Sequence, residues 1–459
     1  MSGPFTTVQE QVDVTPDAID RTEYTTCYMC ACRCGIRVHF KNDEVRYIDG
    51  NPDHPINKGV LCAKGSAGIM NYKSPGRLTK PLKRVGPRGS GEFEEIEWSE
   101  AMDLATEWLS DVRKTDPKRL AFFTGRDQSQ SLTGWWAGRF GTPNFAAHGG
   151  FCSVNMAAGG LYSIGSSFWE FGEPDWERTL YFMMFGVAED HDSNPIKMGL
   201  GHLKSRGEAK FVSVNPVKTG YSAIADEWVG IRPGTDGLFA GALIHELLAA
   251  EKIDWDYLAR YTNAPWLVIQ APGTADDGLF ARDRDGNPLI LDGKTNKLVS
   301  ALEAGGSPVM SGSVDIAGQR AVPAFHLMAK RFLDKSYSPE EAEKFCGVSA
   351  ETIRRIAAEL AHAAFERSIE LDVDWTDWAG RKQTKIVGRP VSLHAMRGVS
   401  AHSNGFHTCR ILHLLQMILG TIDVPGGFRS KPPFPRPVPP GPKPAGHKSE
   451  ANKPLEGMP

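Results

Sequence analysis

Three short runs of consecutive apolar residues stand out in the middle of the chain, and each ends at a turn residue. They occupy residues 119–125 (RLAFFTG), 179–187 (TLYFMMFGV) and 209–215 (AKFVSVN). Runs this short and this continuous are typical of strands that are buried on both faces of a parallel sheet. The sequence therefore predicts three buried parallel strands.

Apolar residues at intervals of three and four predict helices between and after these strands. One helix starts at Asn194 and Pro195, between the second and third runs. Residues 236–251 (DGLFAGALIHELLAAE) form another, capped by Asp236 or Thr235, and residues 349–364 form a third that starts at Ser349. Strands alternating with helices indicate the α/β class and a doubly wound parallel sheet.

Polar loops follow the predicted strands, "GVAEDHDSNP" after the second and "NPVKTGYSAIADEWVGIRPGTDG" after the third. Doubly wound sheets bind ligands beyond the carboxyl ends of their strands. The backbone N–H groups at the helix starts there suit an anion such as a pyrophosphate. Ordinary turn chemistry explains the same residue types, so the loops alone leave both interpretations open.

Five of the eight cysteines lie near the start of the chain. Cys27, Cys30 and Cys34 follow the spacing C-x2-C-x3-C, and Cys62 comes 28 residues after Cys34. A tight run of three thiolates and a remote fourth is typical of a [4Fe–4S] cluster, whereas zinc more often uses paired C-x2-C knuckles. Cys32 is a spare thiol in this spacing. Zinc and the absence of any metal are the alternatives.

Two further features accompany the cysteines. Gly35 and Gly65 let the backbone pass close to the sulfur atoms and donate N–H groups, and Lys64 places a cation two residues after Cys62.

Composition limits the possible partners and compartment. The 459 residues carry a net charge of −3 with a pI near 6.5, which gives no reason to expect nucleic acid binding. The apolar run at residues 411–420 is too short to span a bilayer. The first twenty residues carry no pattern of an export signal, which favours the cytoplasm, where cysteines bind metal more often than they form disulfides.

The cysteine run, the segment "CAKG" and residues 75–105 (PGRLTKPLKRVGPRGSGEFEEIEWSEAMDLA) resemble the molybdopterin oxidoreductases of the dimethyl-sulfoxide-reductase type. The resemblance covers residues 24 to about 430. It implies a flexible N-terminus (1–23), a [4Fe–4S] domain (24–82), the first part of a molybdopterin domain (83–150) and a Rossmann-like dinucleotide domain (151–428). A proline-rich, disordered tail (429–459) follows, with eight prolines between residues 432 and 444.

The resemblance also implies the cofactors, which are the cluster, molybdenum and a bis-molybdopterin guanine dinucleotide. Cys152 falls where relatives carry their molybdenum ligand, and Lys64 lies on the electron path. The residues that the resemblance assigns to the pterin dinucleotide are Arg126, Gly186, Glu189, His191, Asn215, Pro216, Lys218, Arg232, Gly234, Asp236, Gly398, His402 and Asn404.

The sequence departs from the family pattern at three positions. Asn215 and Lys218 stand where many relatives have Asp-Pro-Arg, so an amide replaces a carboxylate and a lysine replaces the bidentate fork of arginine. Ser153 follows Cys152 where formate dehydrogenases have histidine, which weakens a formate interpretation.

The function that the resemblance implies is electron exchange between a small oxyanion such as sulfite and the cluster. The partners it implies are a ferredoxin-like iron–sulfur subunit plus a quinone-linked membrane subunit on the inner face of the cytoplasmic membrane. Formate dehydrogenase is the runner-up and nitrate reduction a distant third. A non-catalytic electron carrier or inactive fragment is an alternative of another class.

The chain stops before the C-terminal pterin-binding domain of the family. We therefore expect a truncated product, or else one half of a split enzyme.

Overall fold

The computed structural model describes residues 19–30, 32–125, 130–152, 154–165, 172–187, 194–218, 220–302, 307–395 and 397–429. The chain divides into two compact units. The first comprises residues 1–152, 190–198 and 435–459, and the second comprises residues 153–189 and 199–434. The division after residue 152 lies close to the domain boundary predicted at residue 150. The predicted domain limits themselves remain predictions.

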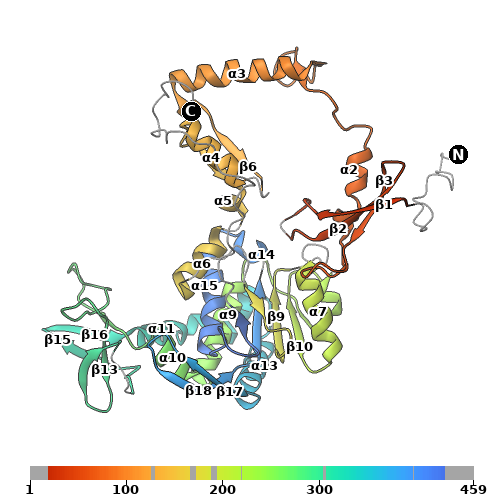
Figure 1. Cartoon of the computed structure of the whole chain (residues 1–459). Coiled ribbons are helices and arrows are strands. Elements are labelled where there is room, and N and C mark those ends of the chain that lie inside the picture. Colours follow the sequence, from red (N-terminus) through yellow and green to blue (C-terminus); the bar gives the residue numbers. More distant parts are fainter. Residues whose placement is uncertain are drawn as a thin grey trace. The chain divides into compact units, whose positions relative to one another are not determined.

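The first unit begins with a three-stranded antiparallel sheet in the order β1 (Arg21–Thr26), β2 (Gly35–Lys41) and β3 (Glu44–Gly50) (Figure 1). Asn42 and Asp43 form the two-residue turn between β2 and β3 with φ of 51° and 62°, the conformation that tight hairpins favour. Cys27, Cys34 and Ile36 form a small buried cluster beneath this sheet. The cysteine-bearing loops are therefore built into the core of this small sheet.

The remainder of the first unit is helical with two short sheets. The strand predicted at residues 119–125 is present as β6 (Phe122–Thr124), which pairs in parallel only with β7. The prediction that this strand is buried is wrong, because Phe123 is 68% exposed. The elements are α1 (Ala63–Ser66), α2 (Gly68–Lys73), β4 (Leu82–Arg84), β5 (Phe93–Glu95), α3 (Trp98–Thr115), β6 (Phe122–Thr124), α4 (Gln130–Phe140), β7 (Phe145–Ala147) and α5 (His148–Cys152).

The second unit is organised around a four-stranded parallel sheet in the order β11, β10, β9, β19. The strands are β9 (Tyr181–Phe185), β10 (Lys210–Val214), β11 (Glu227–Val229) and β19 (Val391–Ala395). Every residue of β9 and β19 is buried, as the continuous apolar run of β9 predicts. The predicted α/β architecture is confirmed, and β19 is a strand that was not predicted from the sequence.

Helices cover this sheet and join its strands (Figure 1). α7 (Asn194–Arg206) links β9 to β10, and α9 (Asp236–Ala249) packs against α12 (Pro339–Cys346), α13 (Ala350–Ala361) and α15 (Gly405–Ile418). α6 (Val154–Ile164) packs on α15. The apolar run at residues 411–420 lies largely within α15, a buried helix of this core. Among the described residues, no helix combines the length and apolar character needed to cross a membrane.

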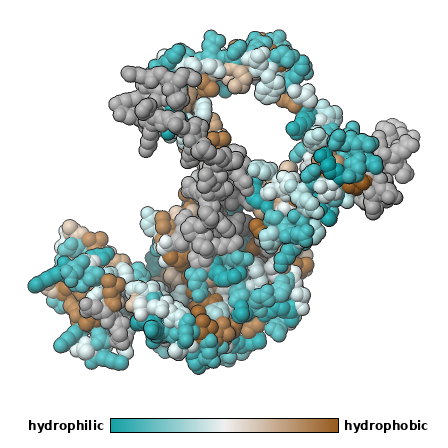
Figure 2. Space-filling model, in the orientation of Figure 1, coloured by the Kyte–Doolittle hydropathy of each residue, from teal (hydrophilic) through white to brown (hydrophobic). Residues whose placement is uncertain are grey.

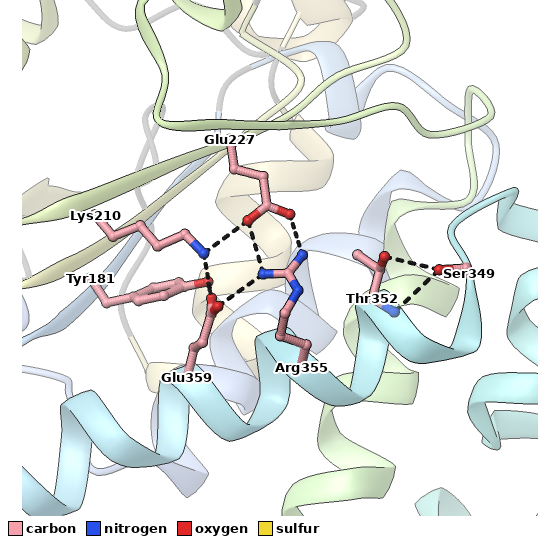
Figure 3. Close-up of polar contacts among 7 residues, drawn as sticks. All are labelled: Tyr181, Lys210, Glu227, Ser349, Thr352, Arg355 and Glu359. Carbon is pink, nitrogen blue, oxygen red and sulfur yellow. Dashed lines mark hydrogen bonds and ion pairs between the residues drawn. The ribbon is translucent and has the colours of Figure 1, made fainter.

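All three predicted helix starts are found in the structure, at Asn194 for α7, at Asp236 for α9 and after Ser349 for α13. The Ser349 hydroxyl accepts a hydrogen bond from the Thr352 N–H at 3.2 Å and caps α13 (Figure 3). Thr235 occupies the cap position of α9, but its hydroxyl donates to the Arg232 carbonyl at 2.7 Å and leaves the helix N–H groups uncapped by a side chain.

An ion network ties α13 to the amino ends of the parallel strands (Figure 3). Tyr181, Lys210 and Glu227 are the first residues of β9, β10 and β11. The Glu359 carboxylate accepts from the Tyr181 hydroxyl at 2.7 Å and from Lys210 Nζ at 2.6 Å, while Arg355 pairs with both Glu227 and Glu359. This network fixes the edge of the sheet opposite to the one that carries the predicted ligand loops.

A lobe of antiparallel strands extends from the second unit, and Figure 2 shows apolar residues interspersed with polar ones over it. Leu279 and Leu302 are more than half exposed there. The strands are β12 (Leu267–Ile269), β13 (Leu289–Asp292), β14 (Lys297–Ser300), β15 (Val314–Ile316) and β16 (Gln319–Pro323). The other elements of the unit are β8 (Glu173–Pro174), α8 (Tyr221–Ile224), α10 (Trp255–Tyr261), α11 (Ala324–Phe332), β17 (Ile369–Thr376), β18 (Lys382–Gly388), α14 (Arg397–Ser400) and β20 (Phe428–Arg429).

Candidate cluster and cofactor site

The four predicted cluster ligands line one pocket of the first unit. Cys27 follows β1, Cys34 precedes β2, and a hydrogen bond from the Cys27 N–H to the Cys34 carbonyl, 2.8 Å long, closes the loop between them. Cys27 and Cys34 are buried, and Cys30 and Cys62 are half-buried. The pocket is lined by Cys27, Met29, Cys30, Cys32, Arg33, Cys34, Leu61 and Cys62.

The thiols of this pocket do not converge on one point among the described residues. A zinc site with Zn–S bonds of about 2.3 Å requires its sulfur atoms to lie within about 4 Å of one another. Within the described ranges, no three Cys, His, Asp or Glu side chains converge in this way. Four thiols distributed around a shared pocket are the arrangement that a cluster of several iron and sulfide ions requires.

The electrostatics of the pocket favour the thiolate form of Cys30. Hydrogen bonding from the Cys32 side chain, which outweighs the opposing effect of burial, lowers the pKa of the Cys30 thiol to about 6. The Cys32 N–H, 3.4 Å from Cys30 Sγ, and the positive charges of Lys64 and Arg33 act in the same direction. The positive charge of Lys64 is therefore close enough to Cys30, a predicted cluster ligand, to lower the pKa of its thiol. The position of Lys64, two residues after Cys62, suggests the same.

In the second unit, the loops after β9 and β19 meet at the carboxyl edge of the sheet. Gly186 follows β9 with φ of 66°, and a Cβ added to Gly398 would lie 2.4 Å from the Gly186 carbonyl oxygen. Because no side chain fits between the two loops, both positions require glycine. The structure thus brings together two predicted site residues that are 212 positions apart in the sequence.

A second contact joins the turn before α9 to the loop before α15. Asn404 Nδ2 donates to the Gly234 carbonyl at 2.9 Å, and a Cβ added to Gly234 would lie 3.4 Å from His402 Nδ1. Asp236, the first residue of α9, is buried, and this burial raises the pKa of its carboxyl group despite the nearby His402. A buried carboxylate at this edge is an available acceptor for the N–H groups of a polar ligand.

Asn215 offers a matching donor at the end of β10. Its side chain is buried, and its Nδ2 has no hydrogen-bond partner among the described residues. The Trp228 indole donates to the Asn215 main-chain carbonyl at 2.8 Å and fixes the turn. A buried amide donor without a partner is costly, so the site suits a bound group that carries polar oxygen or nitrogen atoms.

Other predicted residues are placed differently. The Arg232 guanidinium donates to the Lys344 carbonyl at 2.7 Å and to the Phe345 carbonyl at 3.3 Å, so it holds the last turn of α12. Pro216 and Lys218 are exposed in the loop after β10. Arg126, Glu189 and His191 lie outside the described residues, as does Ser153. Cys152 is the last residue of α5, and its side chain is not among those that the structure describes.

Asn155 was not predicted from the sequence, and it orders the loop of His402. Its Nδ2 donates to the Ser400 carbonyl at 2.9 Å and lies 3.5 Å from the His402 carbonyl. The contact joins residues that are 245 positions apart, and a single asparagine near the start of an apolar helix gives no sign of it in the sequence.

Two protein-family models match consecutive parts of the chain. Residues 20–73 match the model of the molybdopterin oxidoreductase Fe4S4 domain, and residues 77–434 match the molybdopterin oxidoreductase model. The chain is 53% identical over 450 residues to a sulfite dehydrogenase subunit of Allochromatium vinosum, and the match covers 95% of this chain and 46% of that protein. It is 31% identical over 254 residues to the thiosulfate reductase molybdopterin-containing subunit of Salmonella typhimurium, covering 53% of this chain and 32% of that protein.

A solved structure shares the fold. Acetylene hydratase from Pelobacter acetylenicus superposes with a TM-score of 0.58 at 17% identity, over 86% of this chain and 43% of that one. The chain thus spans about half the length, or less, of the relatives it matches. The chain belongs to the molybdopterin oxidoreductase family, with an Fe4S4 domain preceding the molybdopterin domain.

Proposed function

We propose that this chain is part of the catalytic subunit of a molybdenum enzyme that oxidises sulfite. The observation that carries the proposal is the 53% identity to a sulfite dehydrogenase subunit over 95% of the chain. The reaction that this function requires converts sulfite and water into sulfate, two protons and two electrons. Bound molybdenum would supply two-electron chemistry coupled to oxygen transfer, while the protein supplies binding, orientation and electrostatics.

The residues present in the chain fit this role. Cys27, Cys30, Cys34 and Cys62 would hold the [4Fe–4S] cluster, because they share one pocket in which the pKa of Cys30 is lowered. Lys64 would keep a positive charge beside the cluster and favour its reduced, more negative state. We assign Cys152 as the molybdenum ligand from the family pattern around it.

The second unit would hold the dinucleotide of the pterin cofactor at the carboxyl edge of its sheet. Asp236 offers a buried acceptor for the guanine N–H groups, and Asn215 offers a buried donor that has no partner among the described residues. Gly186 and Gly398 let the loops after β9 and β19 pack directly against each other at this edge. Glu189, His191, Arg126, Pro216 and Lys218 complete the proposed set from the family pattern.

Electrons would leave through a ferredoxin-like iron–sulfur subunit toward a quinone-linked membrane subunit on the inner face of the cytoplasmic membrane. This proposal rests on the family alone. Formate oxidation is less well supported, since the alpha chain of formate dehydrogenase 2 from Nitratidesulfovibrio vulgaris is 26% identical over 430 residues. Ser153 also stands where such enzymes carry histidine.

The proposal is tested on anaerobically purified protein by metal analysis and by sulfite-dependent reduction of ferricyanide. We expect iron and molybdenum together, with sulfite and not formate as the electron donor. Replacement of Cys152 by alanine should remove turnover and leave the iron content unchanged. Iron without molybdenum would instead favour a non-catalytic electron carrier, and turnover with formate alone would refute the sulfite assignment.

A further inference from the structure

One fully buried side chain joins two segments that carry proposed cluster ligands. Asn57 lies in the loop between β3 and Cys62 and is 0% exposed. Its Oδ1 accepts a hydrogen bond from the Gly35 N–H at 2.8 Å, and its Nδ2 donates to the Gly35 carbonyl at 3.0 Å and to the Val60 carbonyl at 2.9 Å. Both donor positions and one acceptor position of the carboxamide are therefore in use.

The partners of Asn57 are adjacent to the cysteines. Gly35 directly follows Cys34, and Val60 lies two residues before Cys62. The carboxamide thus connects the end of the three-cysteine run to the segment that brings in the fourth cysteine. Cys27, Cys30 and Cys34 are kept close by eight residues of chain and by their own loop closure, whereas Cys62 must be brought back from 28 residues away.

The loop that carries Asn57 is closely packed and gives this side chain a fixed position. The Asn51 N–H donates to the Gly35 carbonyl at 2.9 Å, and the Gly59 N–H donates to the Asn51 carbonyl at 2.8 Å. A Cβ added to Gly50 would lie 2.2 Å from the Gly59 carbonyl oxygen. Loss of the carboxamide would remove the partner of the buried Gly35 N–H.

We propose that Asn57 is a positioning residue that holds Cys62 at the distance from Cys34 that a four-iron cluster requires. The inference rests on the proposed assignment of the four cysteines to one cluster. Without Asn57, the three clustered cysteines stay in place while Cys62 moves, so the iron bound by Cys62 is the one that is lost. In this step [4Fe–4S]²⁺ releases Fe²⁺ and leaves [3Fe–4S]⁰, which ferricyanide oxidises by one electron to the paramagnetic [3Fe–4S]⁺.

The experiment compares the full chain with its variants Asn57→Ala and Asn57→Asp after anaerobic purification. The aspartate keeps an acceptor for the Gly35 N–H but loses both donated bonds, including the one to Val60. Iron is counted per chain, and the spectrum of [3Fe–4S]⁺ is recorded by electron paramagnetic resonance after addition of ferricyanide. We expect about four irons in the unmodified chain and about three in both variants, with the three-iron spectrum in the variants only.

Asp49→Asn is the matched control. Asp49 lies in the same small sheet, where it accepts from Arg37 Nε at 2.9 Å and lies 3.0 Å from His39 Nε2, and it makes no hydrogen bond to Asn57. This variant weakens the domain and should keep all four irons. Cys62→Ser, which removes the proposed ligand itself, should reproduce the three-iron spectrum.

Two results would overturn the role of Asn57. One is four irons per chain in both Asn57 variants without the three-iron spectrum. The other is loss of all iron in both variants with unfolding of the domain, which would make Asn57 a folding residue. An unmodified chain without iron, or with zinc, would instead refute the assignment of the cysteines to a cluster.

Discussion

Replacement of Glu359 by alanine should destabilise the second unit by an amount that the structure allows us to estimate. Glu359 accepts hydrogen bonds from the Tyr181 hydroxyl, from Lys210 and from Arg355 (Figure 3). Tyr181 is 4% exposed, so its hydroxyl loses its partner at a largely buried position when the carboxylate is removed. Lys210 and Arg355 are partly exposed and retain Glu227 as a partner.

The magnitude follows from these contacts. An unpaired buried hydroxyl costs about 1–3 kcal/mol, and each partly exposed ion pair contributes about 0.2–1 kcal/mol. The free energy of unfolding should therefore fall by about 2–4 kcal/mol, which corresponds to a decrease in melting temperature of about 5–10 °C for a unit of this size. Tyr181→Phe removes the same hydroxyl, so in that background Glu359→Ala should cost about 1–3 kcal/mol less.

Thermal unfolding monitored by circular dichroism measures both effects. Glu340→Ala is the control, because this residue pairs with Arg354 at the surface and should leave the melting temperature almost unchanged. The reasoning would be refuted if Glu359→Ala lowered the free energy of unfolding equally with and without the Tyr181 hydroxyl. That result would show that the buried hydroxyl does not make the main contribution.

The same network has a pH dependence of known sign. Burial opposes ionisation of Glu359, but the hydrogen bonds from Lys210, Tyr181 and Arg355 outweigh it and hold the pKa of the carboxyl below its ordinary value of 4.5. The stabilisation is therefore complete above pH 4.5 and is lost as the pH falls through the lower pKa of the folded state. Glu359→Ala should accordingly be less destabilising in acid, although a protonated carboxyl can still accept from the Tyr181 hydroxyl.

Three further predictions concern the proposed site. Lys64→Ala should lower the reduction potential of the cluster and slow electron transfer, with the iron content unchanged, because a positive charge near Cys30 is removed; redox titration and turnover measure this. Gly398→Ala should destabilise the second unit by about 1–3 kcal/mol and reduce the molybdenum content, since the added methyl group collides with the Gly186 carbonyl; melting and metal analysis measure this. Asp236→Asn should raise the melting temperature of the cofactor-free protein at pH 7, because burial raises the pKa of the carboxyl and penalises its charged form above pH 3.8. The same variant should bind guanosine diphosphate more weakly, which calorimetry measures.

The sequence predicted the strands whose apolar pattern follows directly from burial on both faces of a sheet. The strands at residues 179–187 and 209–215 were found because a parallel strand covered on both faces must be apolar throughout. β19 was missed, since Ser392 and His394 interrupt its apolar run although both are buried. β1 was missed for the opposite reason, because this strand is largely exposed and polar.

The candidate site was predicted in part for similar reasons. The grouping of the four cysteines followed from their spacing, and the pocket that they line agrees with it. Arg232 could not be placed, because a guanidinium that binds an anion and one that binds helix carbonyls look the same in a sequence. Asn57 gave no signal either, since a single asparagine in a loop is normally explained by turn chemistry.

The proposed function depends above all on four particular thiolates of the first unit sharing one cubane. Mössbauer spectroscopy of ⁵⁷Fe-labelled, anaerobically purified protein tests this directly when Cys30→Ser and Cys32→Ser are compared. We expect a four-iron spectrum in the unmodified chain and in Cys32→Ser, and its loss in Cys30→Ser. A four-iron spectrum that survives in Cys30→Ser and disappears in Cys32→Ser would contradict the assignment of Cys30 as a ligand and of Cys32 as a spare thiol.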